Sequence, residues 1–209
     1  MRQWEYNRNP KEYAFGFNKR VLAYFACDLY NVYMTTQLNG AETVFLPFNQ
    51  GSNGAGKDGG AGNPTTEDGK YVTSYFWENV LQKDKLLDIL QKFISYERSE
   101  KKKIMPDGST KTTVSSKVIF PRYHQLDVVR KLVSHVRENG AGHNYLIQHS
   151  AGSGKSNSIA WTAYRMASLH DENNNPIFDS VIIVTDRRVL DQQLQATVSG
   201  FDHTLGTVV

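Results

Sequence analysis

The sequence has little of what marks secreted, membrane-spanning or zinc-binding proteins. A single cysteine, Cys27, is present among 209 residues, so no internal disulfide can form, and no cluster of cysteine and histidine suggests a zinc site. No run of about 18 apolar residues occurs, so no membrane-spanning helix and no membrane partner are expected. The first residues are polar and aromatic and lack the apolar segment of a secretory signal. These absences predict a protein of a reducing, cytoplasmic compartment.

The charge of the chain is nearly balanced. The formal net charge is +3, and charged residues make up 22% and hydrophobic residues 39% of the sequence, which is ordinary for a soluble globular protein. Proteins with no nucleic-acid partner often carry this much positive charge. The composition therefore permits nucleic-acid binding but gives no argument for it.

The first third of the chain predicts β structure followed by a loop. Residues 32–36 and 43–46 are rich in β-branched and aromatic side chains. The dipeptide Asn39-Gly40 between them favours a tight turn, so residues 32–46 are predicted to form a β-hairpin. Six glycines then fall between positions 51 and 62, and this polar segment is predicted to be a flexible loop. It lacks the Gly-Lys-Ser/Thr ending of a phosphate loop.

The next segment is predicted to form a helix and a linker. Leucine, phenylalanine and isoleucine recur at helical spacing within residues 74–96. The polar segment 97–116 follows, with three consecutive lysines at 101–103 and the turn dipeptide Asp107-Gly108. The lysines could contact DNA phosphates, but a solvated connector is the simpler interpretation.

From residue 118 onward, the sequence alternates between patterns typical of helices and of strands. Apolar residues at helical spacing predict helices, and two short apolar runs predict strands. The second run is nearly continuous, as in a parallel sheet that is covered on both faces. The alternation predicts an α/β fold with a doubly wound parallel sheet and flanking helices. The predicted elements are a helix at 122–138, a strand at 145–148, a helix at 154–169, a strand at 181–185 and a helix at 187–198.

A phosphate-binding P-loop is predicted between the first of these strands and the helix that follows it. The run Gly152-Ser153-Gly154-Lys155-Ser156 fits the pattern. Glycines let the backbone curl so that N–H groups point at phosphate oxygens, and the helix start adds its positive end. The alternative is a chance Gly-Lys-Ser in a surface turn. The residues predicted to bind ATP here are Ser150, Ala151, Gly152, Ser153, Gly154, Lys155 and Ser156.

Two of these residues are predicted to act in catalysis. Lys155 would reach the β- and γ-phosphates, and the hydroxyl of Ser156 would hold Mg²⁺. His149 stands where the common pattern has glycine or alanine, and this is the one departure from it. The intact core of the motif makes the departure tolerable.

The order of motifs around the P-loop resembles that of superfamily 2 helicases and translocases. Arg122-x-x-Gln125 precedes the loop, and Thr185-Asp186-Arg187-Arg188 follows the second strand. The resemblance implies that Gln125 contacts adenine with support from Arg122, since an amide can both donate to and accept from the base edge. It also implies that Thr185, Arg187 and Arg188 lie near a DNA backbone. Taken alone, each motif is a polar helix start, and Asp186 could simply cap a helix.

A closer resemblance lies in the amino-acid sequences of five segments. FPRYHQLD (120–127), HNYLIQHSAGSGKSNSIAW (143–161) and VTDRRVL (184–190) resemble the motor (R) subunit of type I restriction endonucleases, as do VYMTTQL (32–38) and FLPFN (45–49). Such subunits join a PD-(D/E)xK nuclease domain to a two-lobed motor that pumps double-stranded DNA with ATP and Mg²⁺. They act in a complex with methyltransferase and specificity subunits, and the specificity subunit recognises the DNA target.

This resemblance implies a division of the chain into three parts. Residues 1–96 would be the C-terminal part of the nuclease-like domain, residues 97–116 the linker, and residues 117–209 the N-terminal part of the first RecA-like motor lobe. The resemblance also implies that the nuclease carboxylates lie before Met1, and that the acidic Mg²⁺ motif and the second lobe lie after Val209. The chain is therefore expected to be a fragment that is inactive alone.

Other interpretations of the sequence remain open. Glu100-Lys101-Lys102 and Asp68-Gly69-Lys70 fit nuclease patterns, but both lie in polar segments and are interpreted as chance matches. The P-loop could belong to another nucleotide-dependent enzyme, such as a small-molecule kinase. It could also be vestigial, in a non-catalytic fragment whose first 96 residues bind a partner.

Overall fold

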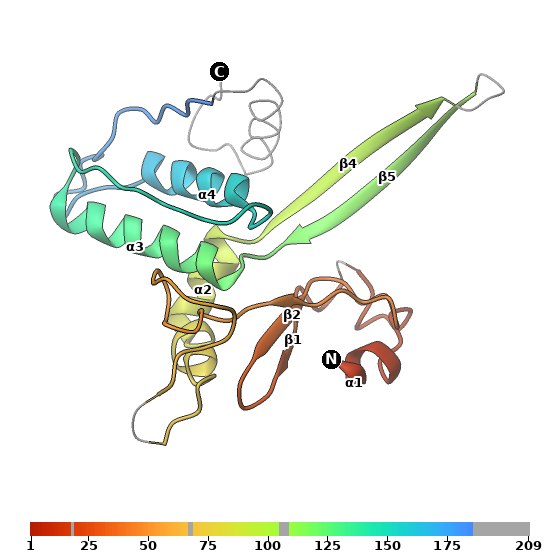
Figure 1. Ribbon diagram of the computed structural model, residues 1–209. Helices are drawn as coiled ribbons and strands as arrows, with labels where there is room; N and C mark the ends of the chain where they lie inside the picture. The colour runs from red at the N-terminus through yellow and green to blue at the C-terminus, as the bar shows by residue number, and fades with distance from the viewer. Residues whose placement is uncertain (18, 67–68, 105–108, 186–209) are drawn as a thin grey trace. The chain divides into compact units, whose positions relative to one another are not determined.

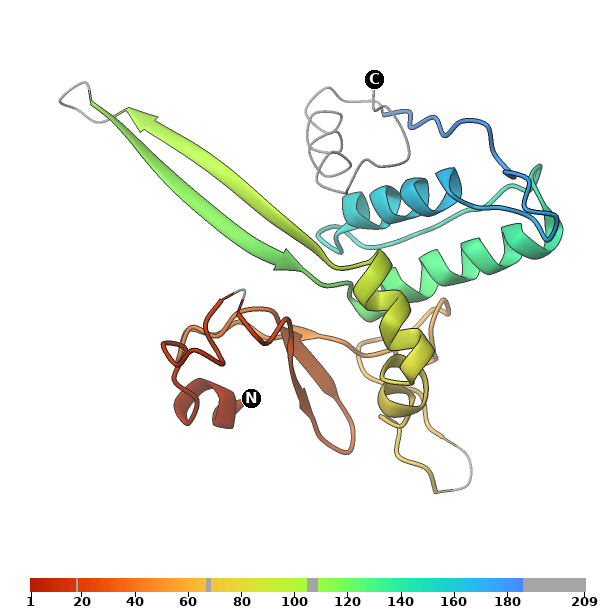
Figure 2. The same cartoon turned by 180° about the vertical axis from the view of Figure 1, so that it is seen from behind.

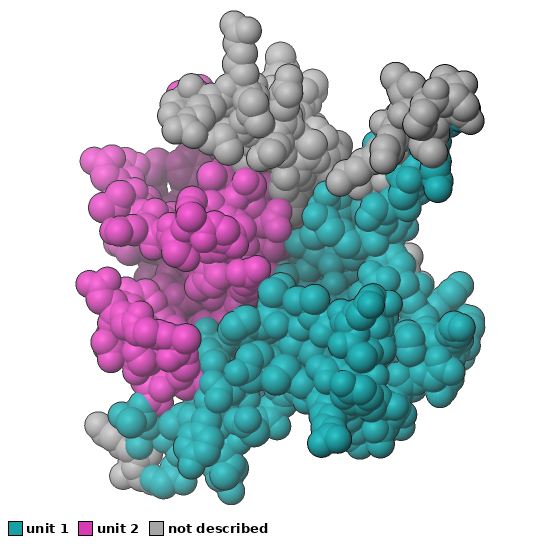
Figure 3. Space-filling view, turned by 45° about the vertical axis from the view of Figure 1, so that its right-hand side comes forward, with its two compact units in different colours: residues 1–49, 65–120 teal, residues 50–64, 121–209 magenta. Residues whose placement is uncertain are grey.

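The fold is mixed α/β and divides into two compact units. The computed structural model describes every residue except 18, 67–68, 105–108 and 186–209. One unit comprises residues 1–49 and 65–120, and the other comprises residues 50–64 and 121–209 (Figure 3). Within the described residues, no helix has the length and apolar character needed to cross a membrane. The assignment of nuclease, linker and motor parts stays a prediction.

The first unit begins with a small antiparallel sheet. A short helix, α1 (Arg2–Tyr6), precedes the strands β1 (Tyr24–Cys27), β2 (Val32–Thr35) and β3 (Leu46–Pro47), which lie in the order β1-β2-β3 (Figure 1). The pairing of β2 with β3 confirms the predicted hairpin. The tight turn expected at Asn39-Gly40 is wrong, because the connection runs from residue 36 to residue 45. Within it the backbone N–H of Asn39 donates to Oγ1 of Thr43 at 2.8 Å.

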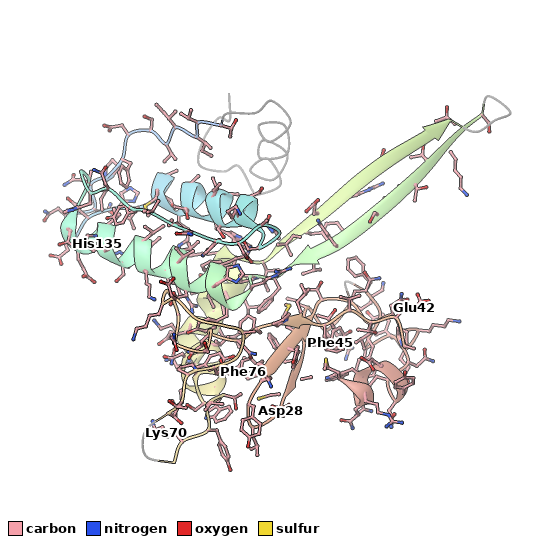
Figure 4. The ribbon with its side chains drawn as sticks, in the orientation of Figure 1. Asp28, Glu42, Phe45, Lys70, Phe76 and His135 are labelled. Atoms are coloured by element: carbon pink, nitrogen blue, oxygen red, sulfur yellow. The ribbon has the colours of Figure 1, made fainter. Side chains whose placement is uncertain are left out.

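An aromatic cluster forms the core of this unit. The ring centroid of Phe25 lies 4.8 Å from that of Phe76, 5.5 Å from that of Phe48 and 5.6 Å from that of Phe120. Figure 4 labels Phe76, which comes from the π-helix η1 (Phe76–Val80). Rings at these separations pack with favourable edge contacts. The cluster therefore joins strand β1, helix η1 and the last residue of the unit.

The single helix predicted at 74–96 is wrong in its extent. It is divided into η1 and α2 (Lys83–Lys92). The break occurs at Gln82, which adopts an extended ψ of 136° and accepts a hydrogen bond from the N–H of Lys85 with its side chain at 3.1 Å. A side chain that accepts such a bond satisfies one of the free N–H groups at a helix start. The cap therefore begins a new helix there.

Residues 97–116, predicted as a linker, contain regular structure that was not expected from the sequence. Strands β4 (Ser95–Ile104) and β5 (Thr110–Ile119) pair in antiparallel register over ten residues each and form a long ribbon (Figures 1 and 2). Polar composition suggested a connector, but β5 is also rich in threonine and valine, which favour strands. Pairing satisfies the backbone polar groups that face the partner strand, and the residues of β5 from Thr110 to Ser115 stay exposed.

The second unit is built on two helices, both predicted. These are α3 (Tyr123–Asn139) and α4 (Lys155–Ala167), which run side by side (Figures 1 and 2). Apolar side chains at helical spacing form their buried faces. The largest fully buried side chain is that of Trp161. The buried apolar residues are Leu126, Val129, Leu132, Val133 and Val136 on α3, and Ala160, Trp161 and Met166 on α4.

The strands predicted at 145–148 and 181–185 are not formed. Both segments lack regular structure, and Leu146 and Val184 have relative exposures of 94% and 88%. A strand exists only where a neighbour supplies hydrogen bonds, and no described residue pairs with either segment. The sheets of the described residues are therefore antiparallel, and the predicted parallel sheet is absent from them. The helix predicted at 187–198 lies outside the described residues.

The glycine-rich segment belongs to the second unit and folds back on itself. The N–H groups of Gly51 and Ser52 donate to the carbonyls of Gly62 and Gly60 at 2.8 and 2.9 Å. Nε2 of Gln50 donates to the hydroxyl of Tyr123 on α3 at 3.0 Å. The segment has no helix or strand, as predicted, but these bonds give it a defined path beside α3.

Candidate nucleotide-binding site

The P-loop backbone is curled and leads directly into a helix. Gly152 and Gly154 have φ values of 72° and 82°, in the left-handed region that glycine adopts without strain. Helix α4 begins at the next residue, Lys155, so its first N–H groups have no partner within the helix. The residues at the mouth of the loop, from Ser150 to Gly152, are exposed. An anion could therefore approach these amides from solvent.

Lys155 lies across the loop that precedes it. Its ammonium Nζ donates to the carbonyl oxygens of Ser150 at 2.9 Å and His149 at 3.1 Å, and the side chain is exposed. These bonds hold the cation over the exposed mouth of the loop. A polyphosphate would exchange two neutral acceptors for charged ones, and hydrogen bonds between charged groups are the stronger kind.

Gln125 ties helix α3 to the P-loop. Its side chain is 3% exposed, and Nε2 donates to the carbonyl of Gly154 at 2.8 Å and to that of Ser153 at 3.4 Å. Its Oε1 accepts from the backbone N–H of Arg122 at 2.8 Å. The amide therefore links the start of α3 to the start of α4. Whether Gln125 also contacts adenine stays a prediction.

Exchanging this amide for a carboxylate is expected to destabilise the second unit. Gln125→Glu keeps the shape of the side chain but replaces its NH₂ donor with a carboxylate oxygen. That oxygen would then face the carbonyl oxygens of Ser153 and Gly154, and two acceptors repel each other. The buried carbonyls lose their donor, which costs about 1–3 kcal/mol. Urea denaturation of both proteins measures the loss. Gln82→Glu is the matched control, because the exposed Gln82 accepts with Oε1 in its cap and donates only a long 3.5 Å bond to Asp84, so this change should cost less stability than Gln125→Glu. An equal effect of both changes would contradict this role of Gln125.

Two histidines, not anticipated as a pair from the sequence, lie beneath the loop. The rings of His124 and His149 are 4.8 Å apart at 84°, and a ring nitrogen of His124 lies 3.0 Å from the carbonyl of Ser153. Nδ1 of His149 is buried without a hydrogen-bond partner among the described residues. The available signals were the position of His124 next to Gln125 and the unusual histidine at the start of the motif.

The surroundings of both rings disfavour protonation. Burial lowers the pKa of His124, the bond to Ser153 opposes this, and the nearby His149 and Arg122 lower it further. Burial also lowers the pKa of His149, and the adjacent Lys155 ammonium acts in the same direction. Protonating either ring would add a cation beside existing ones.

The stability of the chain is therefore expected to fall as pH decreases below about 6.5. Because both folded-state pKa values lie below the ordinary 6.5, the unfolded chain takes up protons first, and stability is fully present above that pH. Urea denaturation between pH 5 and pH 8 measures the slope. The double change His124→Phe with His149→Phe should flatten it, whereas His170→Phe, at an exposed site, should leave it unchanged. A slope that survives the double change would assign it to other groups.

The other predicted site residues are placed only in part. Ser156 is the second residue of α4 and is half-buried, and Thr185 is half-buried in an irregular segment. Arg187 and Arg188 lie outside the described residues, so their prediction as DNA contacts is not addressed. In the two nuclease-like matches, the described side chains make ordinary ion pairs: Glu100 pairs with Arg98 at 3.3 Å, and Lys70 pairs with Glu78 at 3.5 Å. Within the described residues, no group of three acidic, histidine or cysteine side chains could hold a metal.

The geometry of the site is that of a curled P-loop that a glutamine ties to the helix before it. Residues 124–207 match the family model of the SWI2/SNF2 ATPase. The match covers less than half of the chain, and it supports a helicase-like ATPase of superfamily 2 over that segment. No curated protein and no solved structure is significantly similar to the chain.

Proposed function

We propose that the chain is part of the ATP-dependent DNA-translocating restriction subunit of a type I restriction-modification complex. The observation that carries the nucleotide part is the position of Lys155, whose Nζ bridges the carbonyls of His149 and Ser150 above a loop with two left-handed glycines. The family match over residues 124–207 favours a motor over a small-molecule kinase. The segments at 120–127, 143–161 and 184–190 support the restriction assignment.

Each part of the loop has a distinct role in this proposal. The N–H groups of the curled loop and of the first turn of α4 surround the β- and γ-phosphates, which the helix dipole also favours. Lys155 neutralises their charge. The hydroxyl of Ser156 would hold Mg²⁺, which would supply charge neutralisation at the transferring phosphate. The residues present therefore fit a magnesium nucleotide.

Gln125 has a further role if adenine binds beside α3. Its NH₂ group is occupied by the carbonyls of Ser153 and Gly154, and its Oε1 has one lone pair beyond the bond from Arg122. That lone pair is the acceptor available to the amino group of adenine. Base binding would then be coupled to the path of the loop. Thr185, Arg187 and Arg188 would contact the DNA backbone.

Direct binding measurements test the nucleotide site. A fluorescent ATP analogue is expected to bind in a Mg²⁺-dependent manner and to be displaced by ATP and by ADP. EDTA should weaken the interaction, because Ser156 can no longer act through the metal. A chain that binds no nucleotide at millimolar concentration would favour the alternative, a non-catalytic fragment with a vestigial loop.

A separate experiment tests the restriction assignment. Genes for a DNA methyltransferase and a specificity subunit are expected beside the coding sequence, and their products should co-purify with the full-length protein. A helicase-like protein that binds ATP but has neither neighbour would keep the nucleotide site and overturn the restriction assignment.

A further inference from the structure

The glycine-rich segment, residues 50–64, is tied to helix α3 at two places. Nε2 of Gln50 donates to the hydroxyl of Tyr123 at 3.0 Å, and Nζ of Lys131 donates to the carbonyl of Ala55 at 3.1 Å. The partners of these bonds are 73 and 76 positions apart in the sequence. Residues 49 and 65, on either side of the segment, belong to the other unit. The path of the neighbouring chain therefore does not impose these contacts.

The segment is a conformationally costly element that closes on itself. The backbone N–H of Gln50 donates to Oδ1 of Asn63 at 2.9 Å, and the N–H of Gly60 donates to Oγ of Ser52 at 2.7 Å. Ordering its six glycines costs more conformational entropy than ordering other residues. Elements held by scattered hydrogen bonds open more readily than packed helices. The contacts with α3 therefore add stability to a closed form that needs it.

Tyr123 is the point at which the segment reaches the start of α3. It is the first residue of the helix and is half-buried. Burial raises the pKa of its hydroxyl, and the bond from Gln50 opposes this rise. The hydroxyl is therefore protonated at neutral pH and accepts the bond from the amide as a neutral oxygen. The contact is consequently independent of pH over the range in which the histidines beneath the P-loop would titrate.

The same end of α3 also supports the P-loop. Gln125, two residues beyond Tyr123, accepts with Oε1 from the N–H of Arg122 at 2.8 Å. With Nε2 it donates to the carbonyl of Gly154, the residue that precedes α4, at 2.8 Å. The first turn of α3 thus contacts the glycine-rich segment through one side chain and the P-loop through another. A shift of this turn would move the amide that holds the loop.

We propose that Gln50 is a positioning residue for the nucleotide site. By holding Tyr123 it keeps the first turn of α3 in place, and through Gln125 it keeps the P-loop curled. This inference rests on the proposed binding of nucleotide, and it adds control of that site by a segment that lies outside the sequence motifs. Coupling between two events is reciprocal, so bound nucleotide must in turn stabilise the closed segment.

A double-mutant cycle on nucleotide affinity tests the proposal. Gln50→Met removes the donor at nearly constant side-chain length, and Tyr123→Phe removes the acceptor. Each change should weaken binding of a fluorescent ATP analogue with Mg²⁺ by about two- to tenfold, the range of one neutral hydrogen bond. The double variant should be no weaker than either single one, because both changes remove the same bond. The control Gln37→Met, at an exposed glutamine of the other unit, should bind like the unaltered chain.

Hydrogen exchange measures the reciprocal effect. The N–H groups of Gly51 and Ser52 donate to carbonyls within the segment, so their exchange reports its opening. Saturating MgATP should slow their exchange in the unaltered chain, and this response should be lost in Gln50→Met. A glutamine that only stabilised the fold would leave the exchange of these amides insensitive to nucleotide.

The outcomes separate this inference from the nucleotide site itself. Single variants with the affinity of the unaltered chain, or losses that add in the double variant, would overturn the role of Gln50 and leave the nucleotide site intact. An unaltered chain that binds no nucleotide would overturn the site and this inference together. The exchange measurement on the unaltered chain needs no variant to fold. Exchange at residues 51 and 52 that ignores bound nucleotide would therefore overturn the proposal by itself.

Discussion

Replacing Lys155 with alanine is expected to lower the affinity of the chain for MgATP by about 10- to 150-fold. The ammonium donates to two carbonyls within 3.1 Å at the mouth of the P-loop, so it is already positioned to bind a polyphosphate. A hydrogen bond to a charged group contributes about 1.5–3 kcal/mol, and roughly 1.4 kcal/mol corresponds to a factor of ten. In the complete motor, the same change should abolish DNA-stimulated ATP hydrolysis.

Lys57→Ala is the matched control for this change. Lys57 is an exposed lysine of the same unit and lies in the glycine-rich segment, so its loss lowers the net charge equally. Titration with a fluorescent ATP analogue should show unchanged affinity for Lys57→Ala. Circular dichroism should show that Lys155→Ala remains folded, because the lysine is exposed and its bonds are to loop carbonyls. Unchanged ATP affinity in Lys155→Ala would remove the basis of the site assignment.

Gly154→Ala is expected to reduce the free energy of unfolding by about 2–4 kcal/mol and to weaken nucleotide binding. Gly154 has a φ of 82°, and a left-handed conformation costs a residue with a Cβ about 1–2 kcal/mol. The added Cβ would also lie 2.5 Å from Nε2 of Gln125. Gln125 must then move, so the carbonyls of Ser153 and Gly154 lose their donor.

Gly152→Ala separates these two causes. Gly152 has a similar φ of 72°, but a Cβ there would meet no atom within 4 Å. The control should therefore cost only the conformational strain, about 1–2 kcal/mol by urea denaturation. If both variants lost the same stability, the contact with Gln125 would contribute nothing. A Gly154→Ala protein with native stability would mean that the loop has another path in solution.

The site was predictable where its determinants are local. The Gly-x-Gly-Lys-Ser run required a curl with positive φ, and Gly152 and Gly154 supply it. The helix that begins at Lys155 followed from the same few residues. The way in which Gln125 holds the loop was not predictable, because residues 125 and 154 are far apart in the sequence and meet only when α3 and α4 pack together. The pairing of His124 with His149 was missed for the same reason.

For the fold, the sequence alone determined the helices α3 and α4 and the pairing of β2 with β3. For the helices, the hydrophobic period lies within one short segment, and for the hairpin the two strand segments lie close together in the chain around a turn dipeptide. Only the tertiary structure determined which of the extended segments form strands. Residues 97–116 form a ribbon because β4 and β5 pair with each other in register. The apolar runs at 145–148 and 181–185 are irregular because no described strand pairs with them. A helix makes its own hydrogen bonds, whereas a strand depends on a partner that its own residues do not specify.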